Sequence, residues 1–238
     1  MLFAALLLLL SLAHVTTAAV ESINVTMHVP SPCLGHFVMN RSDVLLKLKY
    51  YAENAFEKRA DQQYSEDATL RWVGIHDKVC TPDVPKYSDC SSFVTWIYWT
   101  LFGDGEDLLN GAIWQAGYTG TLWSHGTNQG TDAASLAVGD ICIYGSGPSY
   151  DHAAFYIGDG TVISHGTSDN SAGNWKLGYK SFGAGLPLAG CRRYILKKMV
   201  LYFLIYVFPL TLSKKNSFNI YNSQTVPFLS RWVKRILR

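Results

Sequence analysis

The chain has 238 residues, with 20 Lys or Arg against 18 Asp or Glu. Hydrophobic residues make up 48% and charged residues 16%, which excludes a disordered chain and provides enough apolar surface for a buried core. The net charge of +2 conceals an uneven distribution, because residues 196–238 carry eight basic side chains and no acidic one. Residues 19–195 are therefore mildly acidic, and we expect no nucleic acid as a partner.

The chain begins with an uninterrupted apolar run, LFAALLLLLSLA at residues 2–13, followed by small residues. The run is too short to cross a bilayer as a helix and predicts a secretory signal peptide at residues 1–18; an N-terminal membrane anchor is the alternative. Asn24 and Asn40 each begin an Asn-x-Ser/Thr sequon, an N-glycosylation acceptor if the host is a eukaryote. We therefore expect a secreted, extracellular protein, in a compartment that permits disulfides.

The last residues differ from the rest of the chain. Residues 199–212 are apolar, but they would form a helix of about 21 Å against a hydrocarbon core of about 30 Å, and Pro209 would interrupt it. A basic segment follows at residues 231–235. One interpretation of residues 196–238 is a membrane-surface anchor. The one we favour is an artefact of the gene model, such as translated intron sequence, so membrane contact is expected only if the tail is real.

The first half of the body predicts two helices. A helix is expected near residues 43–60, because Ser42 suits a helix cap and apolar residues follow at helical spacing. Residues 19–41 are expected to form an N-terminal linker, and residues 72–89 a loop. Residues 90–102 have no Gly or Pro and are apolar nearly all round, which predicts a buried helix, with a buried strand as the alternative.

The pattern changes after the second helix. Residues 103–136 are rich in Gly, Thr, Asn and Asp and predict an irregular segment with one short helix. Helices followed by an antiparallel sheet define an α+β fold, in one domain at residues 42–195. The sheet is expected from short β-type runs separated by turn signals, at residues 140–144, 152–157, 161–164 and 190–196.

Five cysteines with no C-x-x-C pair argue against a structural zinc site, and their odd number leaves one thiol unpaired. Cys90 opens the predicted helix, where the helix dipole favours a thiolate and backbone N–H groups can hold an oxyanion. The other four cysteines can form two disulfides in three different pairings. The favoured one ties neighbouring segments together, with the pairs Cys33–Cys80 and Cys142–Cys191.

Two histidines can complete a nucleophilic site. His152 begins an apolar run, where it can accept the thiol proton as a general base. His165 ends the next run, and a hairpin about residues 158–160 would bring both onto adjacent strands, so that His165 could orient the His152 ring. Taken alone, each would be an ordinary surface or core histidine, but together with a cysteine at a helix start they favour catalysis.

Three blocks of the sequence occur in a characteristic order: residues 88–94 (SDCSSFV), residues 139–144 (GDICIY) and residues 152–166 (HAAFYIGDGTVISHG). They resemble the D-C-S-G/S-F/L-V signature, the G-D-L-V-F-F strand and the H-V-G-I-Y-I-G-x-G…I-H segment of the NlpC-type cell-wall peptidases. The resemblance covers residues 70–195. Two departures are Ser92, where many members have Gly, and residues 80–87, which replace an aromatic-Gly-Gly stretch.

The resemblance implies a papain-like fold, in which the Cys-bearing helix packs on an antiparallel β-sheet. It implies Cys90 as the nucleophile, His152 as the base and His165 as the orienting third residue, with no cofactor. It also implies a thiol endopeptidase that hydrolyses amide bonds in peptidoglycan stem peptides, often the γ-D-glutamyl bond to a diamino acid. Peptidoglycan or its muropeptides would then be the partner of a protein that we expect to be a monomer.

Six further residues are candidates for lining a substrate cleft: Trp72, Tyr87, Asp89, Ser91, Trp114 and His125. Core packing is the alternative for the tryptophans, and an ordinary loop position for the histidine. The sequence has no phosphate-binding glycine loop, no G-x-S-x-G elbow and no metal-ligand spacing. Two other classes stay open: a non-catalytic secreted module that binds wall peptides, and a thiol acyltransferase or amidase with a non-wall substrate.

Overall fold

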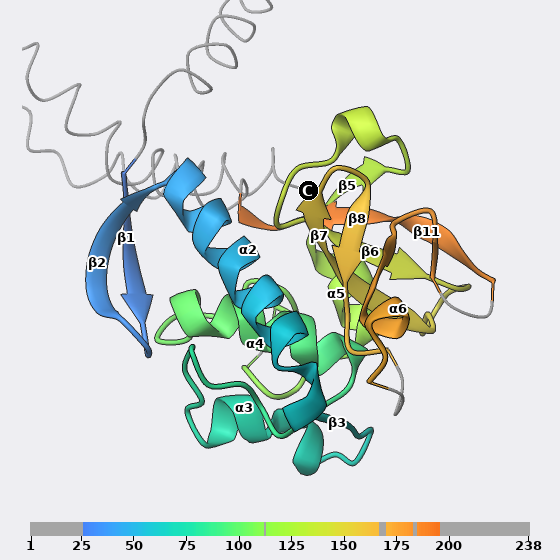
Figure 1. Cartoon of the computed structure of the whole chain (residues 1–238). Coiled ribbons are helices and arrows are strands. Elements are labelled where there is room, and N and C mark those ends of the chain that lie inside the picture. Colours follow the sequence, from blue (N-terminus) through green and yellow to red (C-terminus); the bar gives the residue numbers. More distant parts are fainter. Residues whose placement is uncertain (1–25, 112, 167–169, 183–184, 196–238) are drawn as a thin grey trace, which may run out of the picture. The chain divides into compact units, whose positions relative to one another are not determined.

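The structure is a computed structural model (Figure 1). Three features expected from the sequence lie outside the described residues: the signal peptide at residues 1–18, the sequon at Asn24 and the tail at residues 196–238. Within the described part, no helix is long and apolar enough to cross a membrane. The description covers residues 26–111, 113–166, 170–182 and 185–195.

Helix α4, Cys90–Phe102, begins at the cysteine and confirms the predicted helix against the alternative of a strand. Its N-cap is Asp89, whose carboxylate accepts the Ser92 N–H at 2.6 Å, while the Ser92 hydroxyl accepts the Asp89 N–H at 2.9 Å. This reciprocal capping box satisfies two backbone donors that a helix start leaves unpaired. Every residue of α4 is buried, as expected for a helix that is apolar on all sides.

The main sheet has seven strands, and all its neighbouring pairs are antiparallel. The order is β10-β11-β6-β7-β8-β9, with β5 pairing with β11. The predicted runs appear as β6, β7, β8 and β11, the last beginning four residues earlier than expected. The strands are β5 Thr127–Gly130, β6 Ile141–Tyr144, β7 His152–Gly158, β8 Thr161–Ile163, β9 Lys176–Gly178, β10 Ser181–Phe182 and β11 Leu186–Arg193.

Helix α4 packs against β7, and helix α2, Arg41–Glu57, contacts α4, β7 and β8. In Figure 1 the strands of the main sheet lie to the right of α2. The buried core between these elements includes Trp96 of α4 and Phe155 of β7. The fold is therefore the predicted α+β arrangement, with the Cys-bearing helix on an antiparallel sheet.

Helix α2 starts two residues before the predicted boundary, and the cap is not Ser42. The side-chain oxygen of Asn40 accepts the Asp43 N–H at 2.8 Å, while the Ser42 hydroxyl donates to the same oxygen at 2.7 Å. Asparagine is a strong N-cap when its side-chain oxygen accepts the N–H of the residue three positions later. Asn40 and Ser42 both suit a cap, and no local pattern decides between them.

The expected linker at residues 19–41 is wrong over its described part. Residues 26–40 form an antiparallel hairpin of β1, Thr26–Ser31, and β2, Gly35–Asn40, and β1 contacts α4. The Ser31 hydroxyl donates to the Thr100 carbonyl of α4 at 2.6 Å. Much of β2 is exposed, so the hairpin shows little of the apolar alternation that marks a strand in sequence.

Two disulfides form, with the pairing that the sequence analysis favoured. Cys33 pairs with Cys80, with Cα atoms 5.5 Å apart. Cys142 pairs with Cys191, its direct partner in the register of β6 and β11, with Cα atoms 4.0 Å apart. Cys90 is left as a free, buried thiol.

The segment at residues 72–89, expected to be a loop, contains helix α3, Val73–His76, and a short strand β4, Tyr87–Ser88, which pairs in parallel with β3, Gln63–Tyr64. The irregular segment at residues 103–136 contains the one predicted α-helix and additional short elements. The remaining elements are η1 Arg59–Asp61, η2 Leu70–Trp72, α5 Thr119–His125, η3 Ala133–Ser135 and α6 Ala172–Trp175.

Helix α3 depends on the small size of Gly74. A Cβ atom at this position would lie 2.5 Å from Pro85 Cγ and 2.9 Å from Trp96 Cδ1. We expect Gly74→Ala to lower the free energy of unfolding by about 1–3 kcal/mol, because the segment upstream of Cys90 must move away from α4.

Gly173 of α6 is the matched control, since a Cβ atom there meets no atom within 4 Å. Gly173→Ala should raise the free energy of unfolding by about 0.4–1 kcal/mol. Urea unfolding of both variants measures the difference, and equal effects would contradict the close packing at Gly74.

Candidate active site

The thiol of Cys90 lies where the first turn of α4 meets the first residues of β7. Cys90 is 6% exposed. The backbone N–H groups of Ser91 and Ala153 lie close enough to its sulfur to favour the thiolate, and Ala153 directly follows His152. The packing of α4 on β7 therefore places Cys90 beside the residue that follows His152, although the two candidates are 62 positions apart in sequence.

Burial raises the pKa of the Cys90 thiol to about 12, and the Asp89 carboxylate adds to this rise. The two N–H groups and the charge of Arg71 act in the opposite direction. The expectation that the helix start favours a thiolate is therefore wrong for the resting site, because desolvation outweighs the donors at the helix terminus. The resting site holds a neutral thiol.

His152 begins β7 and is buried. Its ring stacks on Phe182, with centroids 3.9 Å apart. Burial, and then the nearby charge of His165, lowers the pKa of His152 to about 3. The imidazole is therefore neutral and able to accept a proton, and its buried Nε2 has no hydrogen-bond partner among the described residues.

His165 lies just beyond β8 and is fully buried. A hydrogen bond of 2.7 Å joins its Nδ1 to the Ser88 hydroxyl, and its ring stacks on Trp175 at 4.5 Å. Burial lowers the pKa of His165 to about 4. It interacts electrostatically with His152, but its hydrogen bond within the described residues is to Ser88, so the orienting role stays a prediction.

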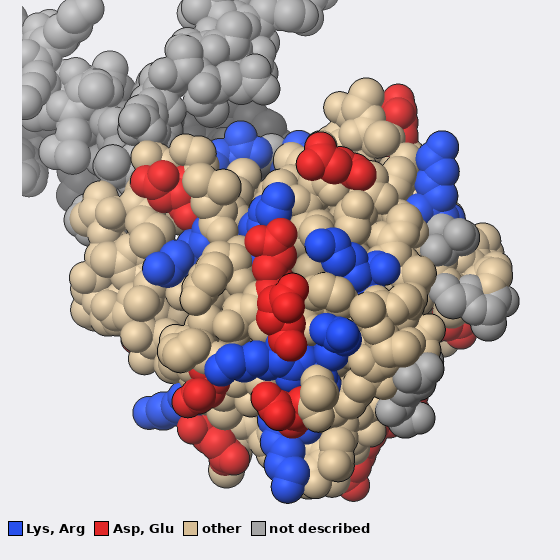
Figure 2. Space-filling view, viewed as in Figure 1, with Lys and Arg blue, Asp and Glu red and all other residues tan. Residues whose placement is uncertain are grey.

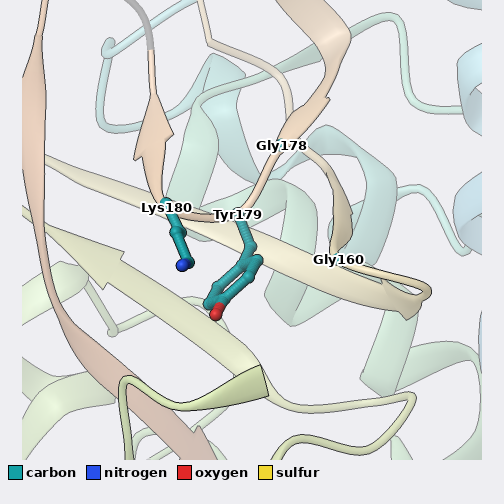
Figure 3. Close-up of a pocket in the computed structure, with 4 residues that line it drawn as sticks. All are labelled: Gly160, Gly178, Tyr179 and Lys180. Atoms are coloured by element: carbon teal, nitrogen blue, oxygen red, sulfur yellow. The ribbon is translucent and has the colours of Figure 1, made fainter. Parts of the chain in front are cut away.

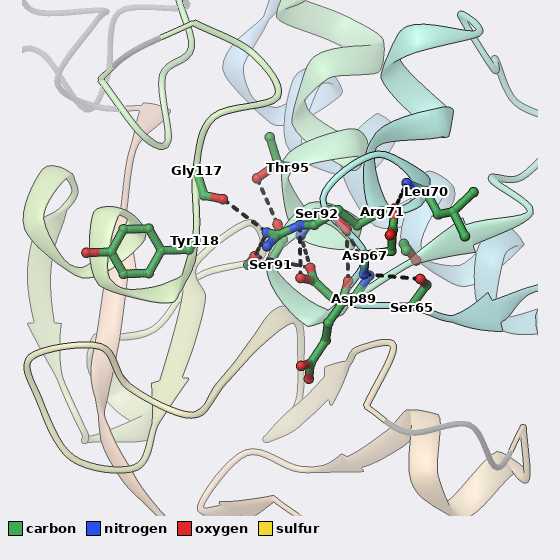
Figure 4. A network of polar contacts seen from close by, with 12 residues as sticks. Ser65, Asp67, Leu70, Arg71, Asp89, Ser91, Ser92, Thr95, Gly117 and Tyr118 are labelled. Carbon is green, nitrogen blue, oxygen red and sulfur yellow. Dashed lines mark hydrogen bonds and ion pairs between the residues drawn. The ribbon is translucent and has the colours of Figure 1, made fainter.

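An ion-pair network surrounds the cap of α4 (Figure 4). Arg71 Nε lies 3.0 Å from Asp89 Oδ2, and Arg71 Nη2 donates to the Ser91 hydroxyl at 2.6 Å and to the Gly117 carbonyl at 3.0 Å. Two candidate cleft residues, Asp89 and Ser91, are thus buried beside the thiol and engaged with Arg71. Sequence reasoning missed Arg71, because it belongs to no motif and its partners are 18 to 46 residues away.

The other candidate cleft residues lie in different surroundings. Trp72 is buried in the core, and Tyr87 is half-buried in β4. Trp114 donates from its indole N–H to the Gly105 carbonyl, and the exposed His125 ring pairs through Nδ1 with the Thr121 carbonyl. No contact recorded among the described residues joins Trp114 or His125 to Cys90.

A small surface hollow of about 250 Å³ lies at the turn between β7 and β8, lined by Gly160, Gly178, Tyr179 and Lys180 (Figure 3). It contains none of the candidate catalytic residues. On the face shown in Figure 2, basic and acidic side chains are interspersed. Among the described residues, no three His, Cys, Asp or Glu side chains converge to hold a metal ion.

No protein-family model matches the chain. Two solved structures of NlpC/P60 family proteins are similar to it. One, from Bacillus cereus, is 26% identical, with 46% of this chain and 32% of that chain covered and a TM-score of 0.34. The other, described as similar to lipoprotein and from Staphylococcus aureus, is 16% identical, with 64% and 41% covered and a TM-score of 0.40. The chain thus spans about a third and two fifths of their lengths. Both belong to the family that the three sequence blocks resemble.

The two buried histidines predict sensitivity to acid. Both pKa values lie below the ordinary 6.5, so the unfolded chain binds protons that the folded chain does not. The free energy of unfolding should fall as the pH is lowered from 6.5, with a slope that approaches about 1.4 kcal/mol per pH unit for each histidine near pH 5.

Urea unfolding between about pH 6.5 and pH 5 measures this slope, above the range in which most carboxylates titrate. His165→Phe removes one of the two titrating groups and should halve the slope. A stability that does not change over this range would contradict the burial of two neutral imidazoles.

The charges around the cap predict opposite effects on the thiol. Asp89→Asn keeps a side chain that caps helices well but removes the negative charge, so the pKa of Cys90 should fall and alkylation by iodoacetamide at pH 8 should become faster. Arg71→Met should slow it. Each unit of pKa changes the thiolate fraction about tenfold.

Asp43→Asn, in the first turn of α2, is the matched control and should leave the alkylation rate unchanged. Thermal unfolding of each variant shows whether the site has stayed folded. Slower alkylation of folded Asp89→Asn would contradict the assigned electrostatics.

Proposed function

We propose that the chain is a secreted cysteine peptidase that hydrolyses amide bonds in bacterial peptidoglycan stem peptides. The observation that carries the proposal is the packing of α4, which begins with the free thiol, on β7, which begins with His152, while His165 is hydrogen-bonded to Ser88, two residues before the thiol. The three sequence blocks supply the substrate class. The bond between D-glutamate and a diamino acid, through the γ-carboxyl group, is the expected point of cleavage.

The chemistry starts from a neutral thiol and a neutral imidazole. As the Cys90 sulfur attacks the substrate carbonyl carbon, His152 takes the thiol proton. Backbone N–H groups at the start of α4 stabilise the oxyanion that develops. The leaving amine takes the proton from His152, and an acyl-enzyme remains. A water molecule, deprotonated by His152, then releases the peptide acid and restores the thiol.

Burial disfavours the separated charges of a thiolate and an imidazolium in the resting site. In the proposed mechanism these charges therefore arise only together with the attack, when the oxyanion donors are engaged. The same burial favours a second candidate function, a non-catalytic module that binds wall peptides and keeps the thiol neutral. A thiol acyltransferase would use the same acyl-enzyme and transfer the acyl group to an amine.

We also propose that the protein works outside the cell, as a monomer. Its two disulfides suit an oxidising compartment. Asn40 remains a candidate glycosylation site, since it caps α2 through its amide oxygen, and its amide nitrogen makes no hydrogen bond within the described part of the chain. The peptidase domain is proposed to include the hairpin from residue 26 and to extend to residue 195.

Wild-type protein and Cys90→Ala, each expressed with secretion into an oxidising compartment, should differ in their action on purified muropeptides. We expect a new fragment with wild type, identified by mass spectrometry, and a loss of about a thousandfold or more in rate with the variant, because no other thiol is free. The mass of the fragment identifies the bond that is cleaved.

The outcomes separate the three functions. Binding of muropeptides by folded wild-type protein, without any fragment, would favour the non-catalytic module. A product joined to an added amine would favour the acyltransferase. Equal activity of wild type and Cys90→Ala would reject Cys90 as the nucleophile.

A further inference from the structure

Ser88 makes a buried contact with the candidate catalytic centre. Its hydroxyl lies 2.7 Å from His165 Nδ1. Ser88 is 1% exposed and His165 is 0% exposed, so no bulk water competes for this hydrogen bond. Its two partners are 77 residues apart, and no pattern in the sequence connects them.

The backbone of Ser88 is held on both sides. Ser88 belongs to β4 and is the register partner of Tyr64 in β3. Its carbonyl accepts the Ser65 N–H at 3.0 Å, and the next residue, Asp89, caps α4. The hydroxyl is therefore presented to His165 by the same turn that presents the Cys90 thiol.

The ring of His165 is confined by two aromatic side chains. Trp175 stacks on one face at 4.5 Å, with planes 26° apart, and Tyr64 meets the ring in a T-shaped contact at 5.5 Å. These contacts fix the plane of the ring but do not decide which nitrogen carries its proton. Among the described residues, the Ser88 hydroxyl is its recorded hydrogen-bond partner.

The Nε2 atoms of His165 and His152 both lack a hydrogen-bond partner among the described residues. Both atoms are buried. The rings lie near enough for the charge of His165 to act on His152. A neutral imidazole has one donor and one acceptor, so one ring can donate to the other if their tautomers match.

Either histidine could donate to the other, and the proposed catalytic role of His152 decides which one does. The buried Nε2 of His152 has no partner among the described residues, and His165 acts electrostatically on this ring, so we assign Nε2 to the contact with His165 and Nδ1 to the thiol proton. Nε2 of His152 must then carry the ring proton before and after the transfer. It needs an acceptor, and Nε2 of His165 is an acceptor only when the proton of His165 is on Nδ1.

We propose that Ser88 is a positioning residue whose hydroxyl accepts the Nδ1–H of His165, so that His165 Nε2 keeps a lone pair for the Nε2–H of His152. The inference rests on the proposed function, because the base role of His152 selects this tautomer. One proton moves, from the Cys90 sulfur to His152 Nδ1, and His165 keeps its own. The two Nε2 atoms are not hydrogen-bonded to each other in this structure, and we expect them to approach when substrate binds, since catalytic hydrogen bonds often form or tighten only then.

The tautomer of His165 can be measured without any substrate. Two-bond ¹⁵N–¹H correlation spectra of the full ¹⁵N-labelled chain report which ring nitrogen is protonated. In wild type we expect the proton of His165 on Nδ1. In Ser88→Ala, which removes the acceptor, we expect the tautomer with the proton on Nε2 to appear, and Ser88→Thr, which keeps a hydroxyl, should restore the wild-type spectrum.

Ser31→Ala is the control, because Ser31 is also 1% exposed and its hydroxyl also makes a buried hydrogen bond, to the Thr100 carbonyl. The substitution removes in addition the two bonds that this oxygen accepts from the N–H groups of Cys33 and Leu34, so it is at least as severe a change as Ser88→Ala. It should leave the His165 spectrum unchanged. Wild type with His165 protonated on Nε2 would overturn the inference, as would a spectrum that Ser88→Ala leaves unaltered. If Ser88→Ala does not fold, the wild-type spectrum still shows which nitrogen of His165 carries the proton, and Ser88→Gly replaces Ser88→Ala as the variant without the acceptor.

Kinetics on muropeptides provides the second measurement. Ser88→Ala should lower kcat about tenfold with KM nearly unchanged, since the hydroxyl acts through His165 and does not touch substrate. Ser88→Thr should recover most of kcat, and Ser31→Ala should keep it. A change confined to KM would overturn the positioning role.

The two proposals fail in different ways. If wild-type protein releases no fragment from muropeptides, the proposed function fails while the spectra still report the tautomer. If wild type is active and Ser88→Ala is equally active with an unchanged spectrum, the role of Ser88 fails alone.

Discussion

The packing of the first turn of α4 on the first residues of β7 is the contact on which the candidate site depends. Helix α4 is apolar on every side, so it can be stable only when it is enclosed. Enclosure places its N-terminus, and with it the Cys90 thiol, against the backbone of Ala153. The burial that stabilises the helix also raises the pKa of the thiol and lowers the pKa of His152.

The candidate site consequently contains a neutral thiol and two neutral imidazoles, next to the buried ion pair of Arg71 and Asp89. Arg71 and Asp89 compensate each other beside the thiol, and removing either partner would leave a buried charge uncompensated. Asp89 raises the pKa of Cys90 and Arg71 lowers it, so the two charges partly cancel at the thiol. Asp89 also caps α4.

Covalent and strand contacts hold the two sides of this junction. The Cys33–Cys80 bridge ties the N-terminal hairpin to the segment upstream of Cys90, and Ser31 joins the hairpin to the far end of α4. On the other side, the Cys142–Cys191 bridge joins β6 to β11, and β6 pairs directly with β7. The thiol and the histidines therefore sit on elements that are fastened independently of substrate.

The sequence by itself determined the helix that begins at Cys90, the hairpin that carries His152 and the odd count of cysteines, because each is written in a local pattern of spacing or number. Only the tertiary structure decided the contacts of Arg71 and Ser88 and the burial that raises the pKa of the thiol. Ser88 meets His165 across 77 residues. The pKa of Cys90 depends on how much water the packed chain excludes, and neither distance in space nor desolvation is encoded at any single position of the sequence.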